Sequence, residues 1–368
     1  MKTVCNIDAC CGCMLCVEIC PKQAVSICDS LKAYNAVIDT NACVSCGLCS
    51  KFCQVNYPLP LSETIFWKQG WAKDSFIRCN ASSGGVASAI SASFVKQGGV
   101  VCSCVFQNGE FVFKIAKNEE EVKEFVGSKY VKSNPIGIYK RIQEYLNRGI
   151  KVLLIALPCQ IAAAKRFVSN DELFFTIDLI CHGSPSPIFL SKYLMDNNID
   201  IRGIDKLNFR KKSHWGLYNN HIVLKPSFAK DHYTITFLNS TIYTENCYHC
   251  VYATEKRVSD ITIGDSWGSD LSDEEKKLGI SLILCQTKKG ESLIEMADLC
   301  LHDVNIENAI EHNHQLSHPS IPNRMRPKFI SMIQKGKNYN FAYKVCFPKK
   351  YIISTAKKIL NFLRLPNE

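Results

Sequence analysis

Residues 10–21 of the chain read CCGCMLCVEICP, and residues 43–54 repeat the same cysteine spacing as CVSCGLCSKFCQ. In each run, three cysteines are separated by two residues each, and a fourth follows after three more. Three such thiolates on a tight loop can bind three irons of one cubane, while the fourth cysteine reaches a neighbouring cluster. The spacing therefore predicts two [4Fe–4S] clusters near the N-terminus.

The predicted ligand sets are crossed between the two runs. Gly12 and Gly47 stand where each loop bends around inorganic sulfide, and Gln54 takes a place where proline is usual. Zinc prefers two pairs of ligands per tetrahedral site and disulfides need an oxidising compartment, so neither explains the two runs as well. Over about the first 57 residues, this stretch resembles bacterial two-cluster ferredoxins. One set is Cys10, Cys13, Cys16 and Cys53, and the other is Cys20, Cys43, Cys46 and Cys49.

The chain of 368 residues is 46% hydrophobic and 21% charged, as is typical of a soluble globular protein with room for further domains. Although it has 21 cysteines, no apolar signal segment precedes the first cysteine run. No apolar run reaches the length needed to span a bilayer. We therefore expect a reducing, cytoplasmic compartment.

The formal charge of +10 lies in residues 324–368, which hold eleven Lys or Arg residues and one acidic residue. The remaining residues, 1–323, are balanced in charge, which argues against nucleic acid as a partner. Near the end of the chain, apolar side chains fall on one helical stripe opposite lysines: Ile352, Ala356, Ile359, Leu360 and Leu363. This pattern predicts peripheral contact with an anionic inner membrane surface, or docking on the protein's own body or on an acidic partner.

A region with two similar strand–helix units follows the proline-containing segment 57–60. Residues 151–156 and 173–180 are predicted strands that are apolar throughout, and helices are expected at 161–168 and 188–195. Such alternation predicts a largely parallel sheet covered on both faces by helices. Ligands of such sheets gather at the carboxyl ends of the strands.

The flanking segments are expected to extend this sheet. A helix at 86–97 and strands at 100–106 and 111–116 precede the two units. Residues 204–238 have more strand character, with alternation over Tyr233–Phe237. A strand at 281–285 and a helix at 291–299 are expected to complete the fold.

Four more cysteines stand where their side chains can meet. Cys159 and Cys181 follow neighbouring predicted strands, and Cys247 and Cys250 form a Cys-x-x-Cys pair. Four converging thiolates predict a third [4Fe–4S] cluster, with zinc as the alternative. The first two are otherwise small buried apolar residues. The other cysteines show no ligand spacing and are assigned structural roles: Cys5, Cys11, Cys28, Cys79, Cys102, Cys104, Cys285, Cys300 and Cys346.

Other polar residues at loop positions are candidates for binding or catalysis. Ser83, Gly84 and Gly85 enter a helix whose N–H groups can bind a phosphate, although such a stretch is also an ordinary capped helix start. Lys129 can balance phosphate charge. His182 can donate a proton beside Cys181, or it has only a structural role. Asp265 and Trp267 can line a flat aromatic ligand, or Trp267 belongs to the core.

Several of these motifs occur in an order that resembles the coenzyme F420 hydrogenase/dehydrogenase beta-subunit family over roughly residues 65 to 300. They are Gly127–Val131, Pro158–Gln160, Cys181–Gly183, Phe209–Lys211, Cys247–Cys250 and Asp260–Asp265. Members with a fused ferredoxin module and this Gly-Ser-Lys-Tyr-Val loop often accompany bacterial surface-polysaccharide synthesis.

The resemblance implies FAD on an α/β domain, held at Ser83, Gly84, Gly85, Lys129 and Tyr130, with an iron–sulfur cluster beside it. It places the cluster cysteines at Cys159, Cys181, Cys247 and Cys250. The expected fold is therefore α+β, with a ferredoxin-like domain followed by an α/β flavin-binding domain whose second half is richer in strands. The expected divisions are 1–57 for the ferredoxin domain, 58–64 for a linker, 65–150 and 151–323 for the two parts of the flavin domain, and 324–368 for a basic tail.

The expected function is that of an iron–sulfur flavoprotein oxidoreductase. Electrons would pass from a donor through the ferredoxin module and the third cluster to FAD and an organic acceptor, or in reverse. The acceptor is an F420-type deazaflavin, a sugar intermediate, a quinone or a tetrapyrrole. The alternatives are an electron-transfer adaptor that docks on a partner enzyme, and a metal-stabilised scaffold at the membrane.

Overall fold

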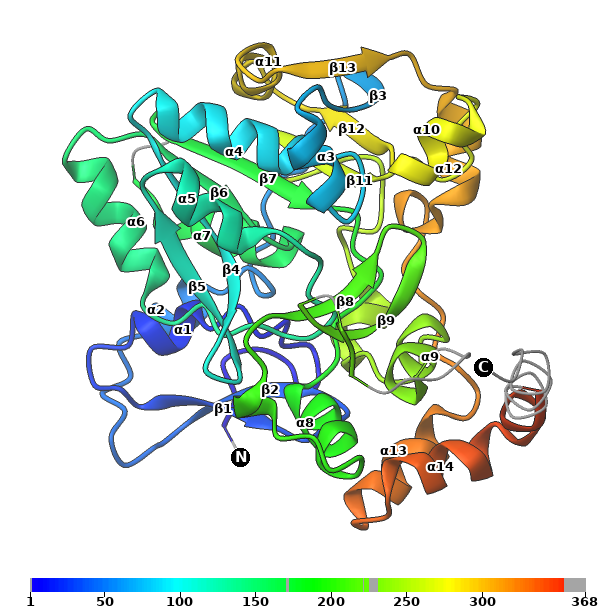
Figure 1. Ribbon diagram of the computed structural model, residues 1–368. Coiled ribbons are helices and arrows are strands. Elements are labelled where there is room, and N and C mark those ends of the chain that lie inside the picture. The colour runs from blue at the N-terminus through cyan, green and yellow to red at the C-terminus, as the bar shows by residue number, and fades with distance from the viewer. Residues whose placement is uncertain (1, 170–171, 221, 225–230, 354–368) are drawn as a thin grey trace.

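The structure is a computed structural model that describes residues 2–169, 172–220, 222–224 and 231–353. In this part of the chain, the strands form one eight-stranded sheet, one three-stranded sheet and one two-stranded sheet (Figure 1). Helices pack on the large sheet, so the protein is of the mixed α/β class.

The large sheet is parallel in its centre and antiparallel at its edges. Its order is β13-β3-β12-β11-β7-β6-β4-β5. The pairs β4–β6, β6–β7 and β7–β11 are parallel, and the other four are antiparallel. The strands are β3 (Phe66–Ala72), β4 (Val100–Gln107), β5 (Glu110–Ala116), β6 (Val152–Ile155), β7 (Phe174–Leu179), β11 (Ile261–Asp265), β12 (Ser281–Cys285) and β13 (Leu299–His302).

The expectation of a largely parallel sheet is therefore wrong for the edges. At one edge, Asn108 and Gly109 adopt positive φ values of 52° and 83° and close a tight hairpin between β4 and β5. A two-residue hairpin can join only antiparallel strands. At the other edge, β3 and β13 add strands that the sequence patterns did not predict.

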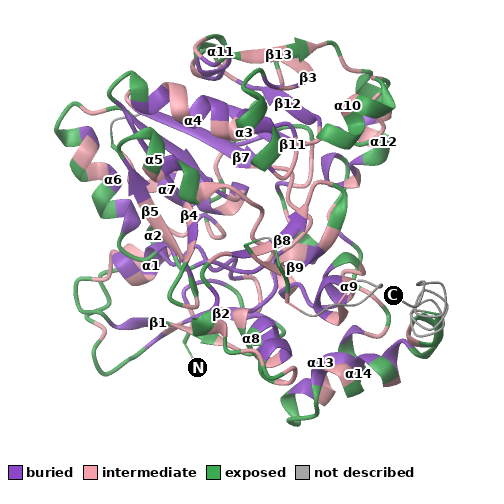
Figure 2. Cartoon of the chain, viewed as in Figure 1, coloured by how far each residue is buried: buried purple, intermediate pink, exposed green. Residues whose placement is uncertain are grey.

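Helices cover both faces of the sheet, as the apolar strands predicted. On one face, α4 (Val86–Lys96) and α11 (Lys288–Glu295) pack on Val101 and Leu153. On the other face, α6 (Ile138–Asn147) and α7 (Pro158–Phe167) pack on Cys102 and Leu154. The adjacent residues along β4 and β6 thus point to opposite cores, and β6 and the first half of β4 are buried (Figure 2).

The cysteine runs lie in a small N-terminal unit, residues 2–57, which we call the cysteine module. It contains α1 (Leu15–Glu18), α2 (Leu48–Lys51) and a hairpin of β1 (Val25–Asp29) and β2 (Tyr34–Ile38). Gly12 and Gly47 have φ values of +75° and +73°, a region that glycine adopts without strain. A Cβ atom on Gly12 would lie 2.7 Å from the Tyr34 ring, so the first loop also needs glycine for space.

The module is joined to the body, which comprises the rest of the described chain, by an apolar core and buried hydrogen bonds. Cys11, Cys13 and Leu15 share a core cluster with α6 and α7. The Glu18 carboxylate accepts hydrogen bonds of 2.8 Å and 2.7 Å from the Gly137 and Lys140 N–H groups at the start of α6. A module side chain thus caps a helix of the body, and Figure 1 shows the module lying beside that helix.

The expected linker is also fixed to the body. Ser62 pairs with Arg257 through reciprocal backbone hydrogen bonds of 2.7 Å and 2.9 Å. Leu59 and Leu61 pack against the core that α6 and α7 share with the module. The two parts of the chain are therefore in a defined relative position.

The strand alternation over Tyr233–Phe237 does not form a strand, because these residues lie in helix α9 (His232–Leu238). The Asp231 carboxylate accepts hydrogen bonds from the Thr234 N–H at 2.7 Å and the Thr234 hydroxyl at 2.8 Å, and so caps the helix. Tyr233, Thr236 and Phe237 are buried, which is helical spacing. The strands of this region are β8 (Leu207–Lys211), β9 (His214–Asn219) and β10 (Ile222–Val223).

The chain continues well past the expected last helix. Helices α12 (Ile306–His312), α13 (Arg326–Gln334) and α14 (Tyr339–Cys346) follow β13. Phe329, Tyr339 and Tyr343 are fully buried in a core shared with α8 (Pro187–Met195) and α9. Residues 326–347 are thus packed on the body and are not a separate tail.

The final predicted stripe is described only at Ile352, which is 65% exposed. Ala356, Ile359, Leu360 and Leu363 lie outside the described residues. Among the described helices, none combines the length and apolar character that crossing a membrane requires.

Candidate functional site

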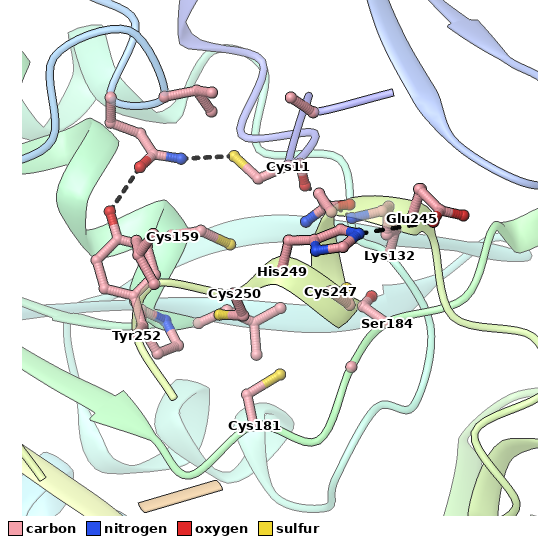
Figure 3. Close-up of a pocket in the computed structure, with 18 of the residues that line it drawn as sticks. Cys11, Lys132, Cys159, Cys181, Ser184, Glu245, Cys247, His249, Cys250 and Tyr252 are labelled. Atoms are coloured by element: carbon pink, nitrogen blue, oxygen red, sulfur yellow. Dashed lines mark hydrogen bonds and ion pairs between the residues drawn. The ribbon is translucent and has the colours of Figure 1, made fainter. Parts of the chain in front are cut away.

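Five cysteines line one cavity of about 400 Å³ between the module and the body, which we call the cysteine cavity. Four of them are the predicted third set, and the fifth is Cys11 of the module. Figure 3 shows their side chains around a common space. The cysteines are Cys11, Cys159, Cys181, Cys247 and Cys250.

The body brings its four cysteines to this cavity from three chain segments. Cys159 is in the first turn of α7, and Cys181 follows β7 at the carboxyl edge of the sheet. Cys247 and Cys250 lie in and directly after a 3₁₀ turn, Glu245–His249. The parallel strand order β6–β7 places the first two side by side, as the sequence predicted.

Burial and a neighbouring thiol raise the pKa of three of these cysteines. Burial raises the pKa of Cys181 to about 12 and that of Cys250 to about 11. The pKa of Cys159 is also raised, first by a hydrogen bond with Cys11 and then by burial. At these three positions the thiolate is therefore disfavoured at pH 7 unless a cation binds to it.

Cys11 was assigned a structural role from the sequence, but its thiol faces the cysteine cavity. The Gln54 side-chain amide donates a 2.8 Å hydrogen bond to the Cys11 sulfur, drawn as the dashed line at Cys11 in Figure 3. Tyr252 donates a 2.5 Å hydrogen bond from its hydroxyl to the Gln54 carbonyl oxygen. Gln54, at the place where proline is usual, thus joins the module to the segment that carries Cys250.

Two buried cations line this cavity, Lys132 and Arg257, and Arg257 is paired with Asp178. Only 5% of the surface of Lys132 is exposed, and its ammonium donates a 2.7 Å hydrogen bond to the Cys11 carbonyl oxygen. Burial lowers the pKa of Lys132, but the surrounding sulfur atoms, those of Cys247 and Cys159 foremost, outweigh burial and raise it. No carboxylate forms an ion pair with Lys132 among the residues that the structure describes. No spacing pattern in the sequence pointed to this residue.

A second cavity, of about 210 Å³, lies at the carboxyl edge of the sheet, and we call it the glycine cavity. Ser83, Gly85 and Lys129 of the predicted flavin contacts line it, together with apolar side chains such as Ile155 and Ile263. The Lys129 ammonium donates a 2.7 Å hydrogen bond to the Phe125 carbonyl oxygen. Burial lowers the pKa of Lys129 to about 8.

Gly84 and Tyr130, the other two predicted contacts, lie outside the lining of the glycine cavity. The Gly84 N–H donates a 3.1 Å hydrogen bond to the Ser281 hydroxyl, and a Cβ atom there would meet the Ser281 backbone at 2.8 Å. The Tyr130 ring stacks between Trp215 and Phe237 at centroid distances of 5.2 Å and 4.6 Å. Gly84 and Tyr130 thus contact neighbouring protein residues and do not line the cavity itself.

A third, polar cavity of about 540 Å³ is lined by Lys212, Lys276 and Lys277, and we call it the lysine groove. Asp265 and Trp267, the predicted aromatic-ligand residues, also line it. Asp265 accepts two 2.7 Å hydrogen bonds from Arg210 and is therefore already paired. Trp267 is 38% exposed and does not belong to the core.

The three cavities are neighbours that share lining residues. Leu157 lines both the cysteine cavity and the glycine cavity. Ser82 and Ser83 line both the glycine cavity and the lysine groove. The glycine cavity thus lies between a sulfur-rich cavity and a polar groove that three lysines line.

His182, the predicted proton donor, lines the cysteine cavity but is held by its neighbours. Its Nδ1 atom lies 2.7 Å from the Gln315 amide nitrogen, and its carbonyl oxygen accepts a 2.7 Å hydrogen bond from Ser320. Burial, followed by the charge of His314, lowers the pKa of His182 to about 4. The imidazole is therefore neutral at pH 7.

The eight cysteines of the two runs gather in two groups that differ in exposure. Cys10, Cys16 and Cys53, from the two ends of the module, pack in one apolar cluster. Cys20, Cys43, Cys46 and Cys49 line one small cavity of about 20 Å³. Cys5, which was assigned a structural role, hydrogen-bonds with Cys10 and Cys53, and this raises its pKa.

Among the described residues, no three His, Cys, Asp or Glu side chains converge as a single metal ion would require. A cubane binds each cysteine through a different iron, so its four ligands are attached at four separate points. None of the 21 cysteines, all of which lie within the described residues, forms a disulfide.

Two family models match the chain. The model for the N-terminal region of the coenzyme F420 hydrogenase/dehydrogenase beta subunit matches residues 68–137, and the model for its C terminus matches residues 149–305. These matches confirm the resemblance predicted for the body. The cysteine module lies outside both matches.

Among solved structures, a chain of the F420-reducing [NiFe] hydrogenase complex from Methanosarcina barkeri, from a xenon-derivatization study, is similar at 18% identity and a TM-score of 0.47. The similarity covers 76% of this chain and 92% of that chain. No match was found among curated proteins. The two family matches together span more than half of the sequence, and the chain therefore belongs to the coenzyme F420 hydrogenase/dehydrogenase beta subunit family.

Proposed function

We propose that this chain is an iron–sulfur flavoprotein oxidoreductase that exchanges electrons with an organic molecule. The observation that carries the proposal is that the cysteine cavity, the glycine cavity and the lysine groove lie next to one another and share lining residues. When bound, [4Fe–4S] clusters supply one-electron transfer, and FAD converts between one-electron and two-electron chemistry.

The cysteine cavity fits a [4Fe–4S] cluster in the chemistry of its donors. Cys159, Cys181, Cys247 and Cys250, all half-buried, would hold the cluster. The buried ammonium of Lys132 has no carboxylate partner among the described residues, so this space suits an anionic group. A cubane with four thiolate ligands is such a group.

The module would hold two further clusters on the crossed ligand sets, as a two-cluster ferredoxin domain over residues 1–57. Gly12 and Gly47 allow the loops to approach a cluster without a side chain in the way. Residues 65–323 would then be the flavin domain, with residues 58–64 as the connection.

The glycine cavity and the lysine groove together fit a flavin dinucleotide better than either does alone. Ser83 and Gly85 offer polar backbone at the start of α4, and Lys129 offers a cation. The apolar wall of Ile155 and Ile263 suits a flat ring, and the groove extends the space beyond Ser83. The three lysines of the groove would attract an acidic acceptor such as a deazaflavin coenzyme.

Anaerobic purification followed by iron, sulfide and flavin analysis tests the proposal. We expect about twelve irons per chain, from three [4Fe–4S] clusters, and FAD in stoichiometric amount. Lys129→Met should weaken FAD binding by about tenfold, measured by titration of the flavin-free protein, since it removes a nearby charge. Lys123→Met is the matched control, because Lys123 is 55% exposed and pairs only with Glu120. Colourless protein with bound zinc and no flavin would overturn the proposal.

An electron-transfer adaptor without its own substrate is the second candidate. The exposed Cys46 and the 58% exposed Val44 favour it, because they offer a partner protein access to the second cysteine run. Reduced protein that is reoxidised only by a partner protein, and by no small acceptor in a screen, would decide for the adaptor.

A further inference from the structure

Lys132 lies between the cysteines of the module and those of the body. It follows the loop Gly127–Val131, and its backbone N–H donates a 2.9 Å hydrogen bond to the Pro185 carbonyl oxygen of the body. Its side chain reaches into the module, where the ammonium donates to the Cys11 carbonyl oxygen at 2.7 Å. The ammonium also lies 5.3 Å from the centroid of the Tyr34 ring.

The two carboxylates that line the cysteine cavity form ion pairs with other residues. Asp8 forms a 2.8 Å ion pair with Lys32, and Glu245 forms a 3.1 Å ion pair with Arg326. A lysine ammonium that is 95% removed from solvent, with one carbonyl as its hydrogen-bond acceptor, is costly unless a negative charge faces it. The groups that do face it are sulfur atoms.

These sulfur atoms belong to two different predicted clusters. Lys132 lines the cysteine cavity together with the third set, and its ammonium binds the carbonyl oxygen of Cys11, the residue after Cys10. It therefore lies at the junction of the set Cys10, Cys13, Cys16 and Cys53, which we call the inner set, with the third set. The set Cys20, Cys43, Cys46 and Cys49, which we call the outer set, lines a separate small cavity that Lys132 does not line.

On the basis of the proposed function, we propose that Lys132 is a positioning residue for electron transfer that holds the inner cluster and the third cluster at matched, raised reduction potentials. Each one-electron reduction adds a negative charge to a cluster, and a fixed cation nearby stabilises the reduced form relative to the oxidised form. Because burial protects this interaction from screening by salt, one ammonium can act on both clusters.

The test is a redox titration of anaerobically purified holoprotein with dithionite, followed by electron paramagnetic resonance. In Lys132→Met, which keeps the length of the side chain and removes its charge, the inner and third clusters should become harder to reduce. We expect about a tenfold change in each reduction equilibrium, which is about 59 mV for a one-electron couple. The outer cluster, identified as the signal lost in Cys46→Ser, should not change.

Two further variants separate charge from packing. Lys132→Arg keeps the charge and should restore both potentials toward those of the wild type. Lys140→Met removes one charge beside the same interface, but Lys140 is exposed and its charge is screened, so all three potentials should stay unchanged. If Lys132→Met folds poorly, Lys132→Gln provides the same loss of charge with a polar side chain.

The outcomes separate this inference from the proposed function. Wild-type protein without iron would overturn both. Iron-loaded Lys132→Met whose potentials match the wild type would overturn the inference alone, as would an equal shift of all three clusters or an equal shift in Lys140→Met.

Discussion

The inner set and the outer set of cysteines have the same spacing in the sequence but different surroundings in the structure. Cys10, Cys13 and Cys16 of the inner set are 6%, 8% and 8% exposed, whereas Cys46 of the outer set is exposed. Cys10 and Cys16 pack in the module's own apolar core, and Cys13 packs in the core that the module shares with α6 and α7. The spacing therefore predicts which cysteines can act together, and the packing around each set determines how exposed that set is.

The largest effect is expected from the ion pair that anchors the body side of the cysteine cavity. Arg257 and Asp178 are 1% and 0% exposed and form a 3.0 Å ion pair. Arg257 also donates a 2.6 Å hydrogen bond to the Tyr252 carbonyl oxygen, two residues after Cys250. Arg257→Met leaves Asp178 buried without its partner and should destabilise the protein by about 3–5 kcal/mol.

Thermal unfolding of the anaerobic holoprotein measures this loss. Arg202→Met is the control, since Arg202 is 81% exposed and its pair with Asp200 should contribute little. If Arg257→Met unfolded like the control and kept the third cluster, this ion pair would not anchor the third set.

A smaller effect is expected from Gln54, which joins the module to the body. Gln54→Leu removes the hydrogen bonds with Cys11 and Tyr252 and leaves the buried Tyr252 hydroxyl unpaired. We expect a loss of about 1–3 kcal/mol. Limited proteolysis should then release the module sooner, and the inner cluster should be lost to a chelator faster than in the wild type.

Gln143→Leu is the matched control for this change. Gln143 also makes two hydrogen bonds, with Asn147 and the Ser169 N–H, but both are exposed to water. Equal proteolysis of the two variants would show that Gln54 does not hold the module in place.

The smallest effect is expected from the Asp8–Lys32 ion pair, which lies at the exposed edge of the cysteine cavity. Lys32 hydrogen-bonds with Asp8 and lowers the pKa of that carboxyl group below its usual 3.8. Because the folded state has the lower pKa, the stabilisation is complete above the unfolded value and is lost as the pH falls through the folded value. Asp8→Asn should therefore cost at most about 1 kcal/mol at pH 7, since the Lys32 side chain is 50% exposed.

Unfolding midpoints of the wild type and Asp8→Asn, compared between pH 7 and pH 3, check this prediction. The difference should shrink below the unfolded pKa of 3.8 and with added salt. A difference that grew on acidification would contradict the assignment of the Asp8–Lys32 pair.

The sequence predicted the parts of the molecule that depend on local spacing. The repeats around Gly12 and Gly47, the two strand–helix units and the meeting of Cys159 with Cys181 all follow from short patterns of residues. The antiparallel edge strands β3 and β13 were missed because their partners are far away in the sequence. The strand predicted over Tyr233–Phe237 was wrong. The alternation of residue types there suggested a strand, but the Asp231 cap and the burial of one face stabilise a helix.

Cys11 and Lys132 are site residues that the spacing of residues in the sequence could not predict. Cys11 stands inside a ligand run without belonging to it, and Lys132 is one lysine among many. Their positions follow from the way the module packs on α6, which depends on the whole surface of both parts. Gln54 was recognised in the sequence as a departure from the usual proline, but its contacts across this interface were not predicted.

The capping of α6 by Glu18 has a consequence for how this chain can be rearranged. The first turn of a body helix relies on a carboxylate that is encoded more than a hundred residues earlier. Expressing the two parts as separate polypeptides, or grafting another electron carrier onto the front, would leave that turn without its acceptor. The N-terminal unit therefore acts as a built-in subunit, and any exchange of it has to bring an equivalent acidic side chain to the same place.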